Sequence, residues 1–267
     1  MKANKVLITG GASGIGLLLV KKYLKRNFSV AIVDINEESL NKIKTDNKKI
    51  RTLKADLSLD DDIEKAKELI RDFQPDIFIN NAGIVSGKSF IDLTKKDIEK
   101  TFSINVYAPF YLSAEALKYM LKNDSGQIVN LCSASSYVGV PKLSDYAASK
   151  AAILNMDESL RLELKQLKSN VTTTAVCPFY INTGMFDGVK TRFPFLLPIL
   201  KPEYVADKII RAIDKKKPRL IMPRFIFSIF LIKVLSPTIF DALLNFFGVN
   251  NSMEEFKGRK SDYLNSK

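Results

Sequence analysis

Short apolar runs rich in valine and isoleucine alternate along most of this chain with longer segments that have the 3.6-residue apolar period of helices. The apolar runs fall at residues 5–9, 30–34, 50–54, 77–80, 128–132 and 171–176, with a short seventh run at 220–222. The helical segments fall at residues 14–26, 37–45, 60–73, 95–121 and 144–167. Strands that alternate with helices in this way pair in parallel through crossover connections. The chain is therefore predicted to form an α/β fold, a doubly wound parallel sheet of about seven strands covered by helices on both faces.

The composition fits one folded domain inside a cell. Of the 267 residues, 46% are hydrophobic, which is enough for a full core, and no low-complexity linker divides the chain. The two cysteines, Cys132 and Cys177, lie in apolar runs and lack disulfide or zinc spacing; with no histidine in the sequence, no metal site is expected. The first residues enter a strand at once, without a secretory signal. We expect a cytoplasmic protein in a reducing compartment.

Positive charge is in excess, with 41 basic and 29 acidic residues and a net charge of +12. Much of the lysine is scattered along the predicted helices, as on a solvated surface. Attraction to an anionic membrane or to an acidic carrier protein is the alternative reading. The chain has no helix-turn-helix, zinc finger or aromatic-interleaved basic motif, so no nucleic acid partner is expected.

The C-terminal part of the chain is unusually apolar. Its longest charge-free run, residues 225–232, is eight residues long and far short of the ~20 that a membrane-spanning helix needs. Two helical segments broken at Pro237 are predicted instead. They either pack against the protein or a dimer partner, or make peripheral membrane contact through residues 225–248 with Lys233 reaching to the interface. We therefore divide the chain into residues 1–222, with a substrate lid at about 184–202, and a hydrophobic helical extension with a loose basic tail at 223–267.

A glycine-rich loop follows the first predicted strand and opens a helix. Its glycines, Gly10, Gly14 and Gly16, let the backbone turn tightly and approach a pyrophosphate at the helix N-terminus. Asp34 ends the second strand, where its carboxylate can accept hydrogen bonds from the adenosine ribose and repel a 2′-phosphate. The loop has Ser13 rather than a basic residue, and Ile35 and Asn36 follow Asp34, so no cation is expected beside a 2′-phosphate. NAD is therefore favoured over NADP as the cofactor.

Three motifs together make the chain similar to the short-chain dehydrogenase/reductase family. They are the Gly-x-x-x-Gly-x-Gly spacing of the loop, Asn80-Asn81-Ala82-Gly83 after the fourth strand, and Tyr146-x-x-x-Lys150. The resemblance runs from Val6 to about Thr183 and implies a Rossmann-type sheet. It also implies a cofactor site built from Gly10, Ser13, Gly14, Ile15, Gly16, Asp34, Asp56, Leu57, Asn81, Ala82, Gly83, Tyr146, Lys150 and Thr183.

The Tyr-x-x-x-Lys spacing occurs three times and proves little alone. The pairs are Tyr146 with Lys150, Tyr204 with Lys208, and Tyr263 with Lys267. Each spacing puts an ammonium and a phenol on one helix face. Only Tyr146 follows a strand at the carboxyl edge of the sheet, where ligands bind in such folds.

The stretch before Tyr146 holds further hydroxyl side chains. Ser133 leaves the end of the fifth strand thirteen residues before Tyr146, which is the spacing of the family. Ser144 is expected to cap the helix that carries Tyr146. Tyr137 has no cation four residues on and is expected to line the substrate pocket or to pack in the core.

The resemblance implies a Ser-Tyr-Lys-Asn catalytic set. Tyr146 exchanges a proton with the substrate oxygen, because the Lys150 ammonium and the positive nicotinamide ring favour its phenolate. Ser133 holds the substrate oxygen, and Asn105 extends the proton path through water. Hydride passes to or from the nicotinamide.

The segment after the sixth strand resembles the retinol dehydrogenase and 17β-hydroxysteroid dehydrogenase type 11 subgroup. Phe179 replaces the usual glycine of the family there, so the backbone must avoid glycine-only angles. An apolar set either forms a lid over a lipophilic substrate or packs against the C-terminal helices: Phe186, Phe193, Phe195, Leu196, Leu197 and Ile199.

We therefore expect an NAD(P)-dependent oxidoreductase that interconverts a hydrophobic alcohol of the retinoid, steroid or lipid type and its carbonyl. A homo-oligomer, either a dimer or a tetramer, is expected. One alternative is a 3-oxoacyl-[acyl-carrier-protein] reductase whose basic surface docks an acidic carrier, although Asp34 argues against NADPH. A catalytically silent NAD-sensing or membrane-binding module is the other, and the intact Ser133, Tyr146 and Lys150 argue against it.

Overall fold

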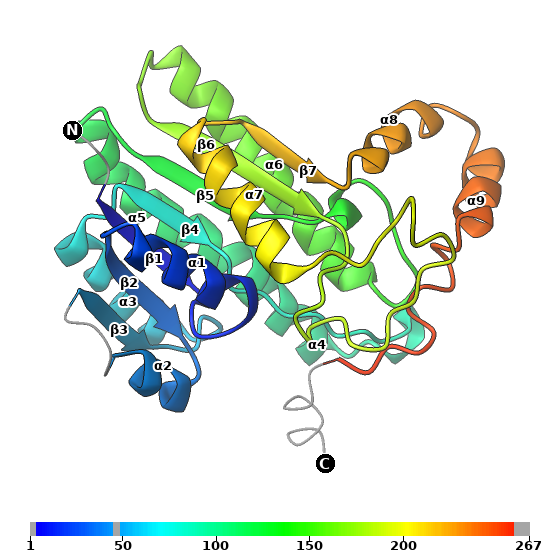
Figure 1. The fold of residues 1–267 in the computed structure, drawn as a ribbon, viewed down its shortest axis with the longest axis horizontal. Helices are drawn as coiled ribbons and strands as arrows, with labels where there is room; N and C mark the ends of the chain where they lie inside the picture. The colour runs from blue at the N-terminus through cyan, green and yellow to red at the C-terminus, as the bar shows by residue number, and fades with distance from the viewer. Residues whose placement is uncertain (1–3, 45–48, 259–267) are drawn as a thin grey trace.

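A parallel sheet of seven strands forms the centre of the molecule, in the order β3-β2-β1-β4-β5-β6-β7 (Figure 1). The computed structural model describes residues 4–44 and 49–258. The strands are β1 (Lys5–Thr9), β2 (Ser29–Asp34), β3 (Ile50–Lys54), β4 (Ile77–Asn80), β5 (Gln127–Leu131), β6 (Thr172–Pro178) and β7 (Arg219–Met222). The predicted α/β doubly wound, Rossmann-type sheet is confirmed, and four strands differ from their predicted bounds by only a residue or two.

Helices cover both faces of this sheet. On one face lie α1 (Gly14–Lys25), α2 (Glu37–Lys44) and α7 (Pro202–Asp214); on the other lie α3 (Asp60–Phe73), α5 (Ala108–Lys122) and α6 (Ser144–Gln166). Successive residues of β1 point to opposite faces, so Val6 and Ile8 join the first apolar cluster and Leu7 joins the second. A strand buried on both sides must be apolar throughout, which explains its continuous hydrophobic run.

The segment predicted as one helix at 95–121 is broken. Its parts are α4 (Lys95–Phe102), a π-helical turn η2 (Ser103–Tyr107) and α5. Pro109 has no N–H to complete a regular turn, and the Ala108 N–H instead bonds the Ser103 carbonyl five residues back. The wider turn carries Asn105, which faces the loop after β4 and α6.

The C-terminal part forms a helical hairpin beside β7. A 3-10 turn η4 (Arg224–Phe227) leads into α8 (Ser228–Ile232), and α9 begins at Pro237, where a break was predicted, and ends at Phe246. In Figure 1 the hairpin projects beyond the edge of the sheet. Within residues 4–44 and 49–258, no helix has the length and apolar character to cross a membrane.

Residues 249–258, here called the strap, return from the hairpin across the loop that follows β6. The Lys190 N–H donates to the Ser252 carbonyl at 3.2 Å, and the Lys257 N–H donates to the Asp187 carbonyl at 2.8 Å. A side-chain ion pair joins Lys190 and Glu255 at 2.5 Å. The tail predicted to be loose, including Tyr263 and Lys267, lies outside the described residues, as does Thr45 at the predicted end of α2.

Candidate active site

A cavity of about 730 Å³ opens at the carboxyl ends of the strands and continues to the C-terminal hairpin. It brings together most of the predicted site residues from seven separate parts of the sequence. The predicted residues that line it are Gly10, Ser13, Ile15, Asp34, Asp56, Leu57, Asn81, Ala82, Gly83, Ser133, Tyr146, Lys150 and Thr183. Gly14, Gly16 and Asn105 do not line the cavity, and their places in the structure explain why.

The glycine loop folds through contacts that only glycine allows. Gly10 and Gly14 have φ of +64° and +52°, in the left-handed region that favours glycine. A Cβ at Gly16 would lie 2.1 Å from the Gly10 carbonyl oxygen and 2.6 Å from Asn81 Nδ2. The Asn81 amide donates to the Thr9 and Gly10 carbonyls at 2.9 Å each. Gly14 and Gly16 therefore shape the loop rather than the cavity wall, and Asn81 ties the loop to β4.

Asp34 anchors the other side of this loop. One carboxylate oxygen accepts from the Ala12 N–H at 2.8 Å, and the other accepts from the Asn36 N–H at 3.0 Å. The half-buried carboxylate lines the cavity and keeps lone pairs for a ribose. The first N–H groups of α1 have no acceptor within the helix. A loop of free N–H groups beside an acidic side chain fits a dinucleotide, with pyrophosphate on the helix and ribose on Asp34.

Tyr146 and Lys150 lie one turn apart on α6, and both are buried. Lys150 Nζ is 5.7 Å from the centre of the Tyr146 ring and donates to the Leu131 carbonyl at 2.7 Å. The Ser133 hydroxyl lies beside the Tyr146 phenol, where its hydrogen bond lowers the phenol pKa. Ser133 is itself held by the Ser135 N–H, which donates to its Oγ at 3.1 Å. The three predicted side chains are thus close together at the end of β5.

Burial dominates the charge states of this pair. It raises the pKa of Tyr146 above its ordinary value of 10, an effect larger than the lowering by Ser133. It lowers the pKa of Lys150 from 10.5 to about 8. Burial therefore keeps the Tyr146 phenol neutral in the protein by itself, and Lys150 is not among the groups that lower its pKa. That Lys150 and a positive nicotinamide ring together favour the phenolate stays a prediction.

Asn105 acts as a brace behind the cavity. Its Oδ1 accepts from the Ile84 N–H at 2.9 Å, while its Nδ2 donates to the Ile84 carbonyl at 2.9 Å and to Ser149 Oγ at 3.0 Å. A Cβ at Gly83 would lie 3.3 Å from both Asn105 Oδ1 and Lys150 Nζ. Asn105 and Lys150 therefore flank Gly83, and the glycine leaves room for both.

The exposed position of the Tyr204 pair agrees with the sequence analysis, which did not assign it to the site, whereas the expectation for Ser144 needs correction. Tyr204 and Lys208 have the same helical geometry as the Tyr146 pair, with Lys208 Nζ 5.3 Å from the ring centre, but Tyr204 is 49% exposed on α7 and does not line the cavity. Ser144 is the first residue of α6 and not its cap, and its buried hydroxyl has no hydrogen-bond partner in the part of the chain that the structure describes.

Tyr137 packs in the core rather than lining the pocket. Its hydroxyl contacts Cys177 Sγ at 3.4 Å, and the Arg219 guanidinium lies 5.9 Å from its ring centre. Tyr137 thus has a neighbouring cation although none stands four residues on, because Arg219 is close in space though far along the chain. Phe179 avoids positive φ, as expected for a non-glycine residue.

The far half of the cavity is apolar. Phe186 and Leu197 of the predicted lid line it, together with Val138, Val140, Leu143, Phe225, Ile226, Ile229, Ile232, Leu244, Phe247 and Val249. Phe193 instead packs on Phe246 and Phe247, with ring centres 5.5 and 6.1 Å apart, and Phe195 is 97% exposed. The lid set is therefore divided among the cavity wall, contacts with the hairpin and the exposed surface.

The strap supplies contacts that the sequence did not indicate. Ser252 Oγ and the Tyr180 hydroxyl are 3.0 Å apart and buried, and Tyr180 lines the cavity. Met253 is 1% exposed in one cluster with Tyr146 and Tyr180. No local motif marks these positions, because their partners are about 70 residues or more away in sequence. Burial raises the pKa of Tyr180 to about 12, so it is neutral.

No group of three or more potential metal ligands occurs within the described residues.

Comparison with known proteins identifies the family. The short chain dehydrogenase family model matches residues 4–192. A Bos taurus protein named short-chain dehydrogenase/reductase family 16C member 6 is 37% identical over 264 residues, covering 96% of this chain and 84% of that protein. Epidermal retinol dehydrogenase 2 of Mus musculus is 36% identical over 264 residues, covering 96% and 85%.

The solved structure of 4-hydroxyisoleucine dehydrogenase complexed with NADH is 25% identical, with a TM-score of 0.74, and the match covers 82% of this chain and 96% of that one. The chain thus agrees with the family in sequence, and its fold agrees with that of a solved dehydrogenase. The chain belongs to the short-chain dehydrogenase family and is an NAD(P)-dependent oxidoreductase.

Proposed function

We propose that the protein uses NAD to interconvert a hydrophobic alcohol, of the retinoid, steroid or lipid type, and its carbonyl. The observation that carries this proposal is the division of the cavity. Polar groups around Asp34 and Asn81 line one part of the cavity, and apolar side chains from the β6–α7 loop and the hairpin line another. Tyr146 is hydrogen-bonded to Ser133 and packs against the ring of Phe186, a member of the apolar set, with ring centres 5.6 Å apart. The similarity to an epidermal retinol dehydrogenase supports the same class of substrate.

In this proposal the chain's own residues handle the proton. NAD, when bound, supplies the hydride acceptor, and NADH the donor. The Ser133 hydroxyl orients the substrate oxygen, and the Tyr146 phenol takes the proton from an alcohol or returns it to a carbonyl at that oxygen. Lys150, 5.7 Å from the Tyr146 ring centre, stabilises the phenolate when charged. Asn105 holds the loop and extends the proton path through water.

The preference for NAD rests on Asp34. A carboxylate at the ribose repels a 2′-phosphate. Besides Lys150, the one cation among the described residues that line the cavity is Lys100, which comes from α4 rather than from the turn after β2. Fluorescence titration with NADH and NADPH tests the assignment, and tighter binding of NADPH would overturn it.

Turnover with a panel of retinol, hydroxysteroids, fatty alcohols and 3-oxoacyl thioesters tests the substrate class. Wild type should act on one of the apolar alcohols, and Tyr146→Phe should lose activity while retaining NADH binding. Tyr204→Phe is the matched control, because it removes the phenol of the exposed pair on α7 and should keep full activity. Activity only on acyl thioesters would favour the reductase alternative instead.

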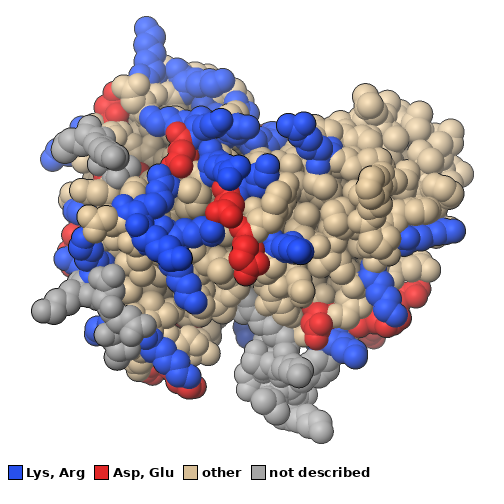
Figure 2. Space-filling view, viewed as in Figure 1, with Lys and Arg blue, Asp and Glu red and all other residues tan. Residues whose placement is uncertain are grey.

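We also propose peripheral membrane contact through residues 225–248. The inner side of the hairpin lines the cavity, whereas its outer side leaves an apolar group exposed: Phe227, Phe230, Leu231, Val234, Leu235, Ile239 and Phe246. Charged side chains are sparse over α8 and α9 in Figure 2. Exposed apolar groups beside a substrate cavity fit entry of a lipophilic substrate from a bilayer.

Flotation with vesicles of neutral and anionic phospholipid tests this contact. Leu231→Glu and Val234→Glu should release the protein from the vesicles without unfolding it, because these side chains are 75% and 84% exposed. Ile91→Glu, 91% exposed beside the exposed Phe90, is the control for a charge placed on another apolar surface. Wild type that stays in solution with both vesicle types would refute membrane contact.

We propose a homo-oligomer that forms through the exposed apolar side chains of α4, of α5 and of the turn between them. Ile98, Tyr107, Phe110 and Tyr111 are each at least 41% exposed, which is unusual for neighbouring large apolar groups on a monomer. Light scattering should give the mass of a dimer or tetramer, and Phe110→Glu should lower this mass.

Residues 1–222 are proposed as the dehydrogenase unit and residues 223–267 as its extension and tail.

A further inference from the structure

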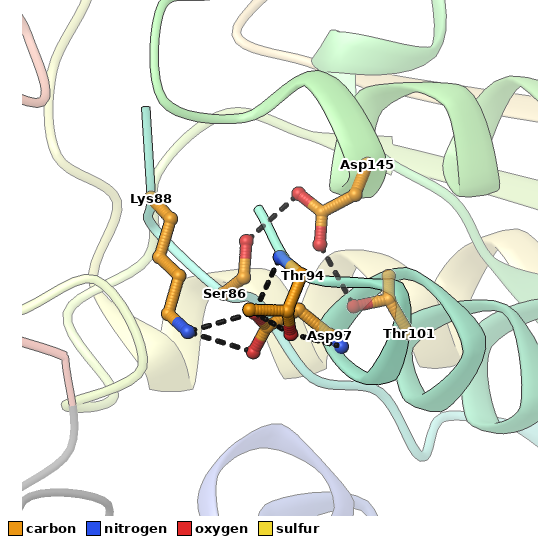
Figure 3. A network of polar contacts seen from close by, with 6 residues as sticks. All are labelled: Ser86, Lys88, Thr94, Asp97, Thr101 and Asp145. Atoms are coloured by element: carbon orange, nitrogen blue, oxygen red, sulfur yellow. Dashed lines mark hydrogen bonds and ion pairs between the residues drawn. The ribbon is translucent and has the colours of Figure 1, made fainter. Parts of the chain in front are cut away.

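Asp145, the residue before Tyr146, is a buried carboxylate with no cationic hydrogen-bond or ion-pair partner among the described residues. It is 5% exposed. One oxygen accepts from the Ser86 hydroxyl at 2.8 Å, and the other accepts from the Thr101 hydroxyl at 2.8 Å (Figure 3). Burying a carboxylate is costly unless hydrogen bonds satisfy it. These two hydroxyl groups are therefore what keeps Asp145 in place.

The contacts matter because the first turn of α6 lacks the usual side-chain cap. Leu143 is the N-cap residue, its side chain accepts no hydrogen bond, and the Ser144 hydroxyl has no partner. A helix end without a cap frays more readily. Tyr146 is the third residue of this helix and follows Ser144 and Asp145. Of these two preceding residues, only Asp145 makes side-chain hydrogen bonds to other elements within the described residues.

Both partners of Asp145 lie on elements that hold the other side of the cavity. Ser86 belongs to the loop after β4, which carries Ala82 and Gly83 at the cavity wall. Thr101 is 1% exposed on α4, just before the π-helical turn of Asn105. Asp145 therefore connects the turn that carries Tyr146 both to the loop at the cofactor side and to α4.

A second polar cluster, here called the clamp and made by Lys88 and Asp97, holds the same loop further from the site. Lys88 Nζ contacts both oxygens of Asp97 at 2.8 and 2.7 Å. Asp97 also completes the capping box at the start of α4 by accepting from the Thr94 N–H at 2.9 Å. Figure 3 shows this clamp beside the Asp145 contacts but separate from them. It stabilises the loop and α4 without touching α6, which makes it an internal control.

We propose that Asp145 is a positioning residue that sets the distance between the Tyr146 phenol and the cofactor side of the cavity. The proposal rests on the proposed function, in which Tyr146 transfers the proton. Loss of either hydroxyl contact lets the first turn of α6 move relative to the loop of Gly83. A displacement of about 1 Å at a reacting group can lower turnover by about 100-fold.

The matched pair Thr101→Val and Thr101→Ser tests this inference. Valine keeps the shape of threonine and removes the hydroxyl, whereas serine keeps the hydroxyl. Thr101→Val should lower kcat by about tenfold or more with KM for substrate and NADH changed by less than about twofold. Thr101→Ser should retain a kcat near that of wild type. If Thr101→Val does not fold, Ser86→Ala removes the other hydroxyl at a half-buried site and has the same expected result.

Amide hydrogen exchange on the protein without cofactor supplies a readout other than activity. Residues 144–149 should exchange faster in Thr101→Val than in wild type and Thr101→Ser. Asp97→Asn should lower Tm but change neither that exchange nor kcat. Equal kcat and equal exchange in Thr101→Val and wild type would refute the positioning role, as would an equal loss of kcat in Asp97→Asn. Wild type without turnover on any alcohol or carbonyl would refute the proposed function, while the exchange comparison would still test the coupling.

Discussion

Lys150 should make the stability of the protein depend on pH in a way that one substitution removes. Burial lowers its pKa from 10.5 to about 8 in the folded protein. Between these values the unfolded chain still binds a proton that the folded chain has released. Because stability rises with pH wherever the unfolded state binds more protons, Lys150 should add stability as pH increases from about 8.

The magnitude follows from the size of that shift. The free energy of unfolding should rise by up to about 1.4 kcal/mol per pH unit while the two states differ by one proton. From pH 8 to pH 9.5 this amounts to about 2 kcal/mol, less the part lost near the midpoint of the titration. Below about pH 7 both states are protonated, so the contribution of Lys150 stops changing.

Urea unfolding of wild type and Lys150→Met at intervals from pH 6.5 to 9.5 measures this effect. Methionine keeps an unbranched apolar chain of similar length and removes the titrating group. The unfolding free energy of wild type minus that of Lys150→Met should increase with pH above about 8. Tyr146→Phe is the control, because burial raises the Tyr146 pKa above 10 and its difference curve should stay flat over this range.

A flat difference curve for Lys150→Met would refute the argument, because it would show that the folded protein keeps Lys150 charged to the same pH as the unfolded chain. A curve that falls with pH would reverse the sign and show that the ammonium is stabilised rather than desolvated. Parallel curves for Lys150→Met and Tyr146→Phe would place the titrating group elsewhere.

Three further substitutions test other parts of the site. Gly16→Ala should weaken NADH binding by at least about tenfold in a fluorescence titration, because its Cβ would lie 2.1 Å from the Gly10 carbonyl oxygen and the loop must shift. Asp34→Asn should narrow the preference for NADH over NADPH in the same assay, because it removes the charge that repels a 2′-phosphate while keeping one acceptor for the Ala12 N–H. Met253→Ala should destabilise the protein by about 2–5 kcal/mol in urea unfolding and raise KM for substrate, because Met253 is 1% exposed in the cluster around Tyr146; Leu231→Ala, at 75% exposure, should leave stability unchanged.

Local patterns in the sequence were enough to predict the sheet and most of the cofactor side. The glycine loop, Asp34 and the Asn81–Gly83 turn each follow a strand within a few residues, so their positions depend on short segments. In a parallel sheet all such turns meet at one edge, which is why twelve predicted cofactor residues line one cavity.

Predictions failed where an outcome depended on partners far along the chain. The break at residues 103–107 has instead a local cause, because Pro109 has no N–H to continue a regular helix. The core position of Tyr137 depends on Cys177 and Arg219, which lie 40 or more residues away.

The sequence by itself determined the order of strands and helices, the loop that accepts a dinucleotide, and the pair Tyr146 and Lys150 on one helix face. These features depend on residues within one or two turns of each other. Tertiary structure alone decided which Tyr-x-x-x-Lys pair is buried, how far burial shifts the Lys150 pKa, and which residues surround Tyr146. Burial and long-range hydrogen bonds, such as those of Asp145 with Ser86 and Thr101 or of Tyr180 with Ser252, arise only when distant segments fold together.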